Sequence, residues 1–165
     1  MIEKILRKSF IISSLLVFSI FLLDRLSKIY VIYLDKKFLG SELLSSKFLN
    51  IRLIWNEGIA FGLFSFGEKT LYNILTILIL VIILAIGFMI IKSKGFKKYS
   101  LLMILAGGLG NVFDRIFYKA VPDFIDFHVG NFHWFIFNVA DIFITVGIIF
   151  LIILEFTDSN KVSTL

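Results

Sequence analysis

The chain has 165 residues and a mass of 19.0 kDa, with 59% hydrophobic residues, 18% charged residues and a mean hydropathy of +0.97. Soluble domains are about 45–50% apolar and about 25% charged, so this composition excludes an ordinary soluble domain and indicates an integral membrane protein. Cysteine is absent, which excludes disulfides, a thiol nucleophile and a thiolate metal or iron–sulfur site. The net charge is +5, and the basic residues lie in short clusters between apolar runs. A nucleic-acid-binding surface instead carries its basic residues as a stripe, so we expect no nucleic-acid partner.

Four apolar segments are long enough to cross a bilayer, whose hydrocarbon core of about 30 Å requires about 20 residues of helix. Residues 71–91 form an uncharged run, whereas residues 10–34, 99–118 and 132–154 each contain ionisable side chains. The sequence therefore predicts an all-α integral membrane protein with four transmembrane helices, organised as a single membrane domain over residues 1–165.

Clusters of basic residues predict which ends of the spans face the cytoplasm, because cytoplasmic loops carry an excess of lysine and arginine. One cluster precedes the first span and another joins the second span to the third; their members are Lys4, Arg7, Lys8, Lys92, Lys94, Lys97 and Lys98. Both termini are therefore expected in the cytoplasm, with the loops 35–70 and 114–131 on the outer, periplasmic side. The N-terminal segment also resembles a secretory signal peptide, but a small-residue cleavage site does not follow it, so we expect a retained span.

The first outer loop, residues 35–70, is too long to be a simple connection. Apolar and polar residues alternate over residues 49–55, a pattern typical of a β-strand. Gly58, Gly62 and Gly67 follow and predict turns. We therefore expect a small β-containing region, a short strand or hairpin, on the outer surface.

Three aspartates reach a similar depth on three of the predicted helices. At about 1.5 Å per residue, Asp24, Asp114 and Asp141 lie roughly 20–22 Å from the cytoplasmic ends of their spans. An ionised carboxylate that faced lipid there would be costly. We therefore expect all three aspartates to face inward and to share a polar pocket near the outer surface.

Polar residues three or four positions apart lie on one face of a helix. Such pairs are Asp24–Lys28, Asn111–Arg115, Asn111–Asp114 and Asn138–Asp141. They can join helices or border a site, and their spacing leaves both interpretations open. The small residues Ala106 and Gly110 favour close packing of another helix against the third span.

Asp141 and Asp123 differ from the other aspartates. Asp141 has no basic residue within four positions along its helix, and Asp123 follows Pro122, which favours an irregular loop above the helices. Two carboxylates in a low-dielectric site cannot both ionise easily, so one can hold a proton as an acid while the other acts as a base on water. This pattern predicts aspartic-protease chemistry, which needs no metal and no cofactor.

Two other chemistries fit the sequence less well. His128 and His133 are five residues apart, which does not match a metal-binding face of a helix, and we interpret them as interfacial residues. Ser27 and Lys28 are adjacent and point about 100° apart on a helix, which is a poor arrangement for a serine–lysine hydrolase.

Two non-protease classes remain as alternatives. A transporter coupled to protons or cations would also carry acids within the membrane, although the aspartates lie near one surface rather than at the midplane. A non-enzymatic assembly subunit would explain the small residues of the third span, but not Asp123 and Asp141.

Five blocks of the sequence resemble, in order, the motifs of the bacterial lipoprotein signal peptidases (signal peptidase II). The blocks are Asp24 with Lys28, Asn56 to Gly62, Gly107 to Arg115, Val121 to Phe124, and Phe137 to Asp141. A match to one block would be weak evidence for the family, whereas matches to five blocks in the same order are specific for it. The resemblance implies an aspartyl endopeptidase of the bacterial inner membrane that cuts the signal peptide from diacylglyceryl-modified prolipoproteins, just before the lipid-modified cysteine.

The resemblance also implies roles for individual residues. The catalytic aspartates correspond to Asp123 and Asp141. The supporting residues correspond to Asp24, Lys28, Asn56, Gly58, Gly108, Asn111, Asp114, Arg115, Asn138 and Ala140. Inhibition by globomycin-type cyclic peptides is implied as well, and the acyl chains of the substrate would stay in membrane lipid between the spans. We expect Trp55, Phe61 and Phe64 to lie at the interface and cover the substrate.

Overall fold

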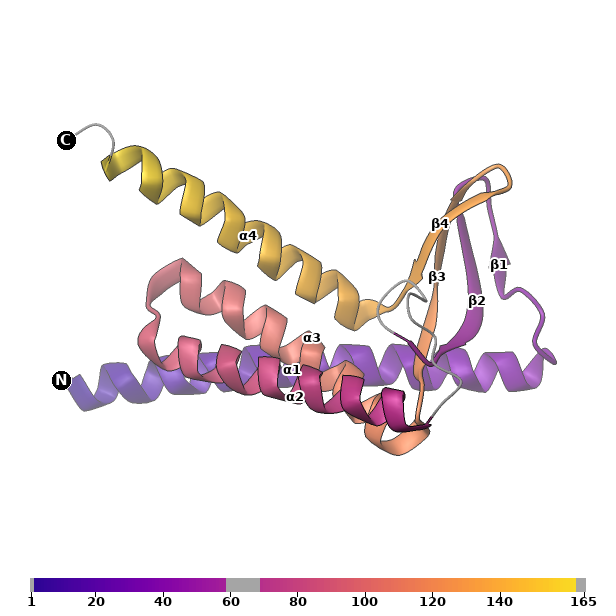
Figure 1. Ribbon diagram of the computed structural model, residues 1–165, viewed down its shortest axis with the longest axis horizontal. Coiled ribbons are helices and arrows are strands. Elements are labelled where there is room, and N and C mark those ends of the chain that lie inside the picture. Colours follow the sequence, from indigo (N-terminus) through magenta and orange to yellow (C-terminus); the bar gives the residue numbers. More distant parts are fainter. Residues whose placement is uncertain (1, 59–68, 163–165) are drawn as a thin grey trace.

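Four long helices form most of the protein (Figure 1). The structure, a computed structural model, describes residues 2–58 and 69–162. The helices are α1 (Ile2–Lys37), α2 (Lys69–Lys92), α3 (Gly95–Tyr118) and α4 (Val139–Val162). Each contains a segment long and apolar enough to cross a membrane, which confirms the four predicted spans.

A small sheet stands at one end of the helices, opposite the end where α1 begins and α4 ends (Figure 1). Its strands are β1 (Leu44–Ser45), β2 (Leu49–Asn56), β3 (Val121–Val129) and β4 (Phe132–Phe137). They pair antiparallel in the order β1-β2-β3-β4. Strand β2 confirms the strand expected in the first outer loop, and its pairing with β3 joins the α1–α2 connection to the α3–α4 connection.

The α3–α4 connection differs from expectation in two ways. Asp123 lies within β3 rather than on an irregular loop, and the fourth helix begins at Val139 rather than at residue 132. Pro122 is compatible with β3 because the β3–β4 ladder begins at Ile125. Among the described residues, no strand therefore pairs with β3 on that side at the proline, where a missing N–H costs no ladder hydrogen bond. Residues 132–137 form β4 because a short apolar run suits a strand as well as a helix, and pairing with β3 decides between them.

Helix α3 is the central helix and contacts α1, α2 and α4. Of the residues in its most apolar segment, 56% are buried, whereas in each of the other three helices this share is 22% or less. Small residues permit this close packing, since a Cβ at Gly107 would overlap the carbonyl oxygen of Ala140 on α4. A Cβ at Gly108, one of the predicted supporting residues, would lie 3.1 Å from Cδ1 of Ile83 on α2.

Substitution of Gly110 by alanine is expected to lower the free energy of unfolding by roughly 1–3 kcal/mol, the usual cost of overpacking. The added Cβ would lie 2.6 Å from Oδ2 of Asp24, and that carboxylate is held in place by Arg25 and Lys28. Gly87→Ala on α2 is the matched control, because no described atom lies within 4 Å of its added Cβ. Thermal unfolding in detergent measures both variants, and equal midpoints would contradict the prediction.

Candidate active site

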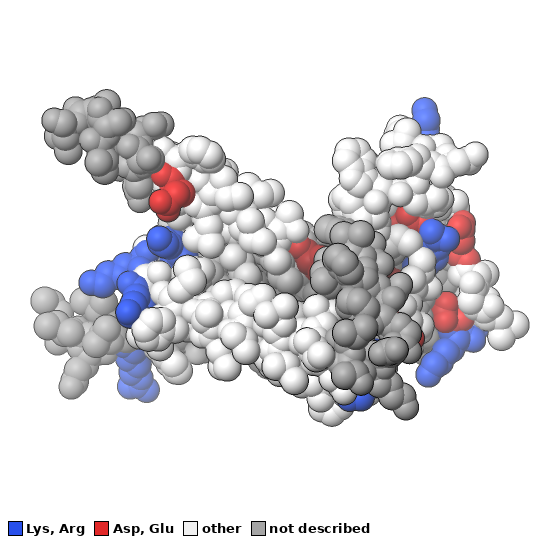
Figure 2. All heavy atoms as spheres, viewed as in Figure 1, with Lys and Arg blue, Asp and Glu red and all other residues white. Residues whose placement is uncertain are grey.

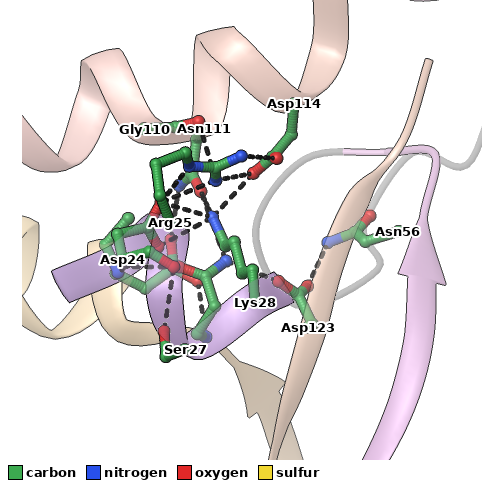
Figure 3. A network of polar contacts seen from close by, with 12 residues as sticks. Asp24, Arg25, Ser27, Lys28, Asn56, Gly110, Asn111, Asp114 and Asp123 are labelled. Carbon is green, nitrogen blue, oxygen red and sulfur yellow. Dashed lines mark hydrogen bonds and ion pairs between the residues drawn. The ribbon is translucent and has the colours of Figure 1, made fainter. Parts of the chain in front are cut away.

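A buried network of four charged residues joins α1 to α3 (Figure 3). Asp24 and Asp114 are fully buried, and Arg25 and Lys28 lie between them. Lys28 Nζ is 2.8 Å from Asp24 Oδ1 and 2.7 Å from Asp114 Oδ2. Arg25 Nη2 donates to Oδ2 of both aspartates at 2.7 Å, and its Nη1 also pairs with Asp114. Two acids thus meet two bases, which is the condition under which buried charges are tolerated.

Arg25 is a member of this network that the sequence motifs did not predict as a site residue. Adjacent residues on a helix point about 100° apart, so Asp24 and Arg25 are not expected to share partners. The long arginine side chain nevertheless reaches back to Asp24 and across to Asp114. An arginine within a membrane span is itself a signal, because such residues are rare unless they are paired.

A reciprocal cap holds Asp141 in the first turn of α4. Asn138 precedes the helix, and its Oδ1 accepts the backbone N–H of Asp141 at 3.2 Å. The backbone N–H of Asn138 donates in turn to Asp141 Oδ2 at 3.1 Å. This is a capping box, and the helix N-terminus also stabilises a negative charge there. Asn111 of α3 completes the surroundings by donating from Nδ2 to Asp141 Oδ1 at 2.8 Å.

Asp123 lies on β3 and is 3% exposed. Its carboxylate accepts a hydrogen bond from Asn56 Nδ2 at 2.8 Å and another from Asn138 Nδ2 at 2.6 Å. Burial, together with the neighbouring charge of Asp141, raises the pKa of Asp123 to about 7, although the two amide hydrogen bonds oppose this rise. Asn138 therefore contacts both Asp123 and Asp141 and brings the two carboxyl groups to one place.

Two contacts connect the charged network to this pair of aspartates. Lys28 Nζ donates to Asn111 Oδ1 at 3.0 Å, and the other end of the same amide binds Asp141. The backbone N–H of Ala140 donates to Asp24 Oδ1 at 3.1 Å. The network on α1 and α3 thus contacts the first turn of α4 both directly and through Asn111.

Gly58 and Arg115 lie beside the pair. The N–H of Gly58 donates to Asn56 Oδ1 at 2.8 Å, which orients the amide that binds Asp123. Arg115 Nη2 donates to the carbonyl oxygen of Gly58, so this arginine contacts the β2 end rather than Asn111, the residue one turn before it. Asn111 and Arg115 thus both face the site, and the long side chain of Arg115 at the end of α3 reaches another element of the fold.

Other residues singled out in the sequence lie farther along the sheet or beyond the described ranges. Phe61 and Phe64 fall outside the described residues, whereas Trp55 lies on β2 with its ring 5.7 Å from that of Tyr118. His128 and His133 pair across β3 and β4 with their ring centroids 5.2 Å apart. Over residues 2–58 and 69–162, no group of three or more histidine, aspartate or glutamate side chains is arranged to hold a metal ion.

The fold and this site define a polytopic membrane protein with two aspartates held together where its helices meet an extramembrane sheet. The profile of the family described as Signal peptidase (SPase) II matches residues 16–157. The lipoprotein signal peptidase of Pelagibacter ubique (strain HTCC1062) is 46% identical over 159 residues, which cover 96% of each chain. The lipoprotein signal peptidase of Anaplasma phagocytophilum (strain HZ) is 36% identical and is covered over 99% of its length.

Two solved structures are also similar to this chain. One bacterial membrane enzyme is 31% identical and superposes with a TM-score of 0.73 over 90% of each chain. A second bacterial membrane enzyme, also 31% identical, has a TM-score of 0.68 and is matched over 91% of its chain. The chain belongs to the signal peptidase II family, and it is a membrane protease that acts on the signal peptides of lipoproteins.

Proposed function

We propose that this protease is an aspartyl endopeptidase that uses Asp123 and Asp141 to cut diacylglyceryl-modified prolipoproteins just before the lipid-modified cysteine. The observation that carries the proposal is the position of Asn138, which donates to Asp123 and is reciprocally capped with Asp141. Two carboxyl groups from a strand and a helix are thereby held at one site. Family membership supports the lipoprotein substrate.

The surroundings of the two carboxyl groups support different roles. Asp141 accepts hydrogen bonds from Asn111 and from the backbone of Asn138 at a helix N-terminus, all of which favour its ionised form. Asp123 is more buried, and its raised pKa favours the protonated form near neutral pH. We therefore assign Asp141 as the general base and Asp123 as the acid.

The reaction then follows the logic of general acid–base catalysis. Asp141 removes a proton from a water molecule, and the resulting hydroxide attacks the carbonyl carbon of the scissile peptide bond. The proton on Asp123 stabilises the oxyanion that forms on the carbonyl oxygen. Collapse of this intermediate breaks the C–N bond, and the proton held by Asp141 passes to the leaving amine nitrogen.

Charge supports the orientation of the protein in the bacterial inner membrane. Lysine and arginine side chains predominate at the end where α1 begins and where α2 joins α3, with an acidic patch beside them at the end of α4, and both signs of charge also occur at the sheet end (Figure 2). The positive-inside bias therefore favours cytoplasmic termini and a periplasmic sheet. In this orientation the two aspartates lie near the periplasmic surface, where water can reach the scissile bond and the acyl chains of the substrate remain in lipid.

Cleavage is expected to decline as the pH rises through about 7, because the raised pKa means that Asp123 keeps its proton below this value and loses it above. Each further pH unit should lower the rate roughly tenfold, as expected for loss of one essential proton. The cleavage rate at saturating substrate, measured across neutral and alkaline pH, tests whether activity falls in this way. A rate that rises across the same range would contradict the assignment of Asp123 as the acid.

The activity itself can be tested with purified protein in detergent and a diacylglyceryl-modified prolipoprotein. We expect a size shift on a gel, a product whose N-terminal residue is the modified cysteine, and inhibition by a globomycin-type cyclic peptide. Cleavage should survive a chelator, because the proposed chemistry uses carboxyl groups alone. Failure of folded protein to cleave this substrate, or a product cut elsewhere, would overturn the proposal.

A further inference from the structure

A long groove runs between α1 and α3 and reaches the end of α2. Its volume is about 1150 Å³, which exceeds the range of about 300–1,000 Å³ that is usual for small-molecule pockets. Its walls are mainly apolar, with Phe10, Val17 and Phe21 from α1 and Leu105 and Leu109 from α3. We call this cavity the α1–α3 groove.

The α1–α3 groove is separate from the candidate active site. Its residues on α3 recur at positions 105, 109, 112 and 116, which form one helical stripe. The glycines and polar residues that face the charged network and α4 lie at positions 107, 110, 111 and 114, on another side of the same helix. The same helix therefore serves two different surfaces.

One end of the α1–α3 groove is polar and basic. Ser9 and Ser13 of α1 lie there with Lys94 and Lys98 at the start of α3. Lys98 Nζ donates to Ser9 Oγ at 3.2 Å, and within the described residues no carboxylate oxygen lies within 4 Å of either lysine ammonium group. This is the end of the molecule where basic side chains gather in Figure 2.

We propose that the α1–α3 groove binds an anionic glycerophospholipid, with its phosphate near Lys94 and Lys98 and its acyl chains along α1 and α3. The charges are complementary, because basic pockets between membrane helices at the cytoplasmic side attract anionic head groups. The dimensions agree as well. From Ser9 to Phe21 the wall on α1 is about 18 Å long, comparable with one leaflet, which contributes half of a hydrocarbon core of about 30 Å. The wall on α3 continues beyond this length to Phe117.

Such a lipid would have a structural consequence. Helices α1 and α2 both pack on α3, and the α1–α3 groove separates α1 from the end of α2. A bound phospholipid fills this space and connects the first helix to the α2–α3 connection. The basic end of the groove lies at the opposite end of the helices from the sheet, while its apolar wall on α3 continues to Phe117. The head-group position is therefore distinct from the place where Asp123 and Asp141 act.

Native mass spectrometry of the purified full chain tests the proposal with phosphatidylglycerol and zwitterionic phosphatidylcholine as probes. Phosphatidylglycerol should bind in preference, and Lys94→Gln combined with Lys98→Gln should weaken its binding roughly tenfold or more. Lys36→Gln combined with Lys37→Gln is the matched control, because it removes the same charge from the far end of α1. An equal loss in the control, or equal binding of the two lipids, would overturn the proposal.

A second variant tests whether the acyl chains occupy the α1–α3 groove. Ser14 is exposed on α1 and lines the groove, so Ser14→Trp should place a bulky ring in it without disturbing buried packing. We expect weaker phosphatidylglycerol binding although both lysines are present, with prolipoprotein cleavage in detergent retained as evidence of folding. Unchanged lipid binding by folded Ser14→Trp would show that the chains lie elsewhere and would contradict the proposal.

Discussion

Replacement of Asp123 or Asp141 by asparagine is expected to reduce the rate of prolipoprotein cleavage by roughly a thousandfold, within the range of about 10²–10⁴ that an acid–base group contributes. Asparagine has nearly the same shape as aspartate, but it can neither take a proton from water nor supply one to the oxyanion. Both substitutions should have this effect, because the proposed reaction needs one carboxyl group in each role.

The control for this pair is Asp35→Asn, near the end of α1, which makes the same chemical change outside the cluster of polar contacts. All three variants should unfold at midpoints close to that of the unmodified protein, so that loss of activity can be separated from loss of fold. Cleavage at the normal rate by either Asp123→Asn or Asp141→Asn would remove that residue from the mechanism.

Breaking the buried charge network is expected to produce the largest loss of stability. In Lys28→Met, two buried aspartates share one cation, Arg25. In Asp114→Asn, the two cations Arg25 and Lys28 share one carboxylate, Asp24. Removing one partner of a buried ion pair costs about 3–5 kcal/mol, because the remaining charge is desolvated without compensation. Each single variant should therefore unfold at a markedly lower temperature or denaturant concentration.

The double variant separates charge balance from lost packing. Lys28→Met together with Asp114→Asn leaves Asp24 and Arg25, one acid and one base, so the charges balance again. Its destabilisation should be clearly smaller than the sum of the two single effects, as expected for residues in one network. Strictly additive losses would show that the four charges do not act as a unit.

Several features of the fold could be predicted because they depend on local patterns. The apolar runs predicted four spans, and all four helices are present. Alternation over residues 49–55 predicted β2, and the small residues of the third span predicted close helix contacts, which Gly107 and Gly110 make. Helix depth predicted that Asp24, Asp114 and Asp141 would share a polar pocket. Lys28 bridges the first two, and Asn111 links Lys28 to the third.

Other features depended on partners that are distant in the sequence. Residues 132–137 are as apolar as a span, and their pairing with β3 makes them a strand. That pairing moves the start of α4 to Val139 and places Asp141 in its first turn. Arg115 lies one turn from Asn111 but contacts Gly58 from another element.

The sequence by itself thus determined the membrane class, the number of spans and the inward aspartates, because hydropathy and helical periodicity act over neighbouring residues. Tertiary structure alone decided how Asp123 and Asp141 come together. Asp123 lies on a strand, Asp141 lies in the first turn of a helix, and Asn138 contacts both. The spacing of residues along a single helix or strand does not predict such contacts. Hydrogen bonds between elements need a particular relative placement, and that placement comes from packing of the whole chain.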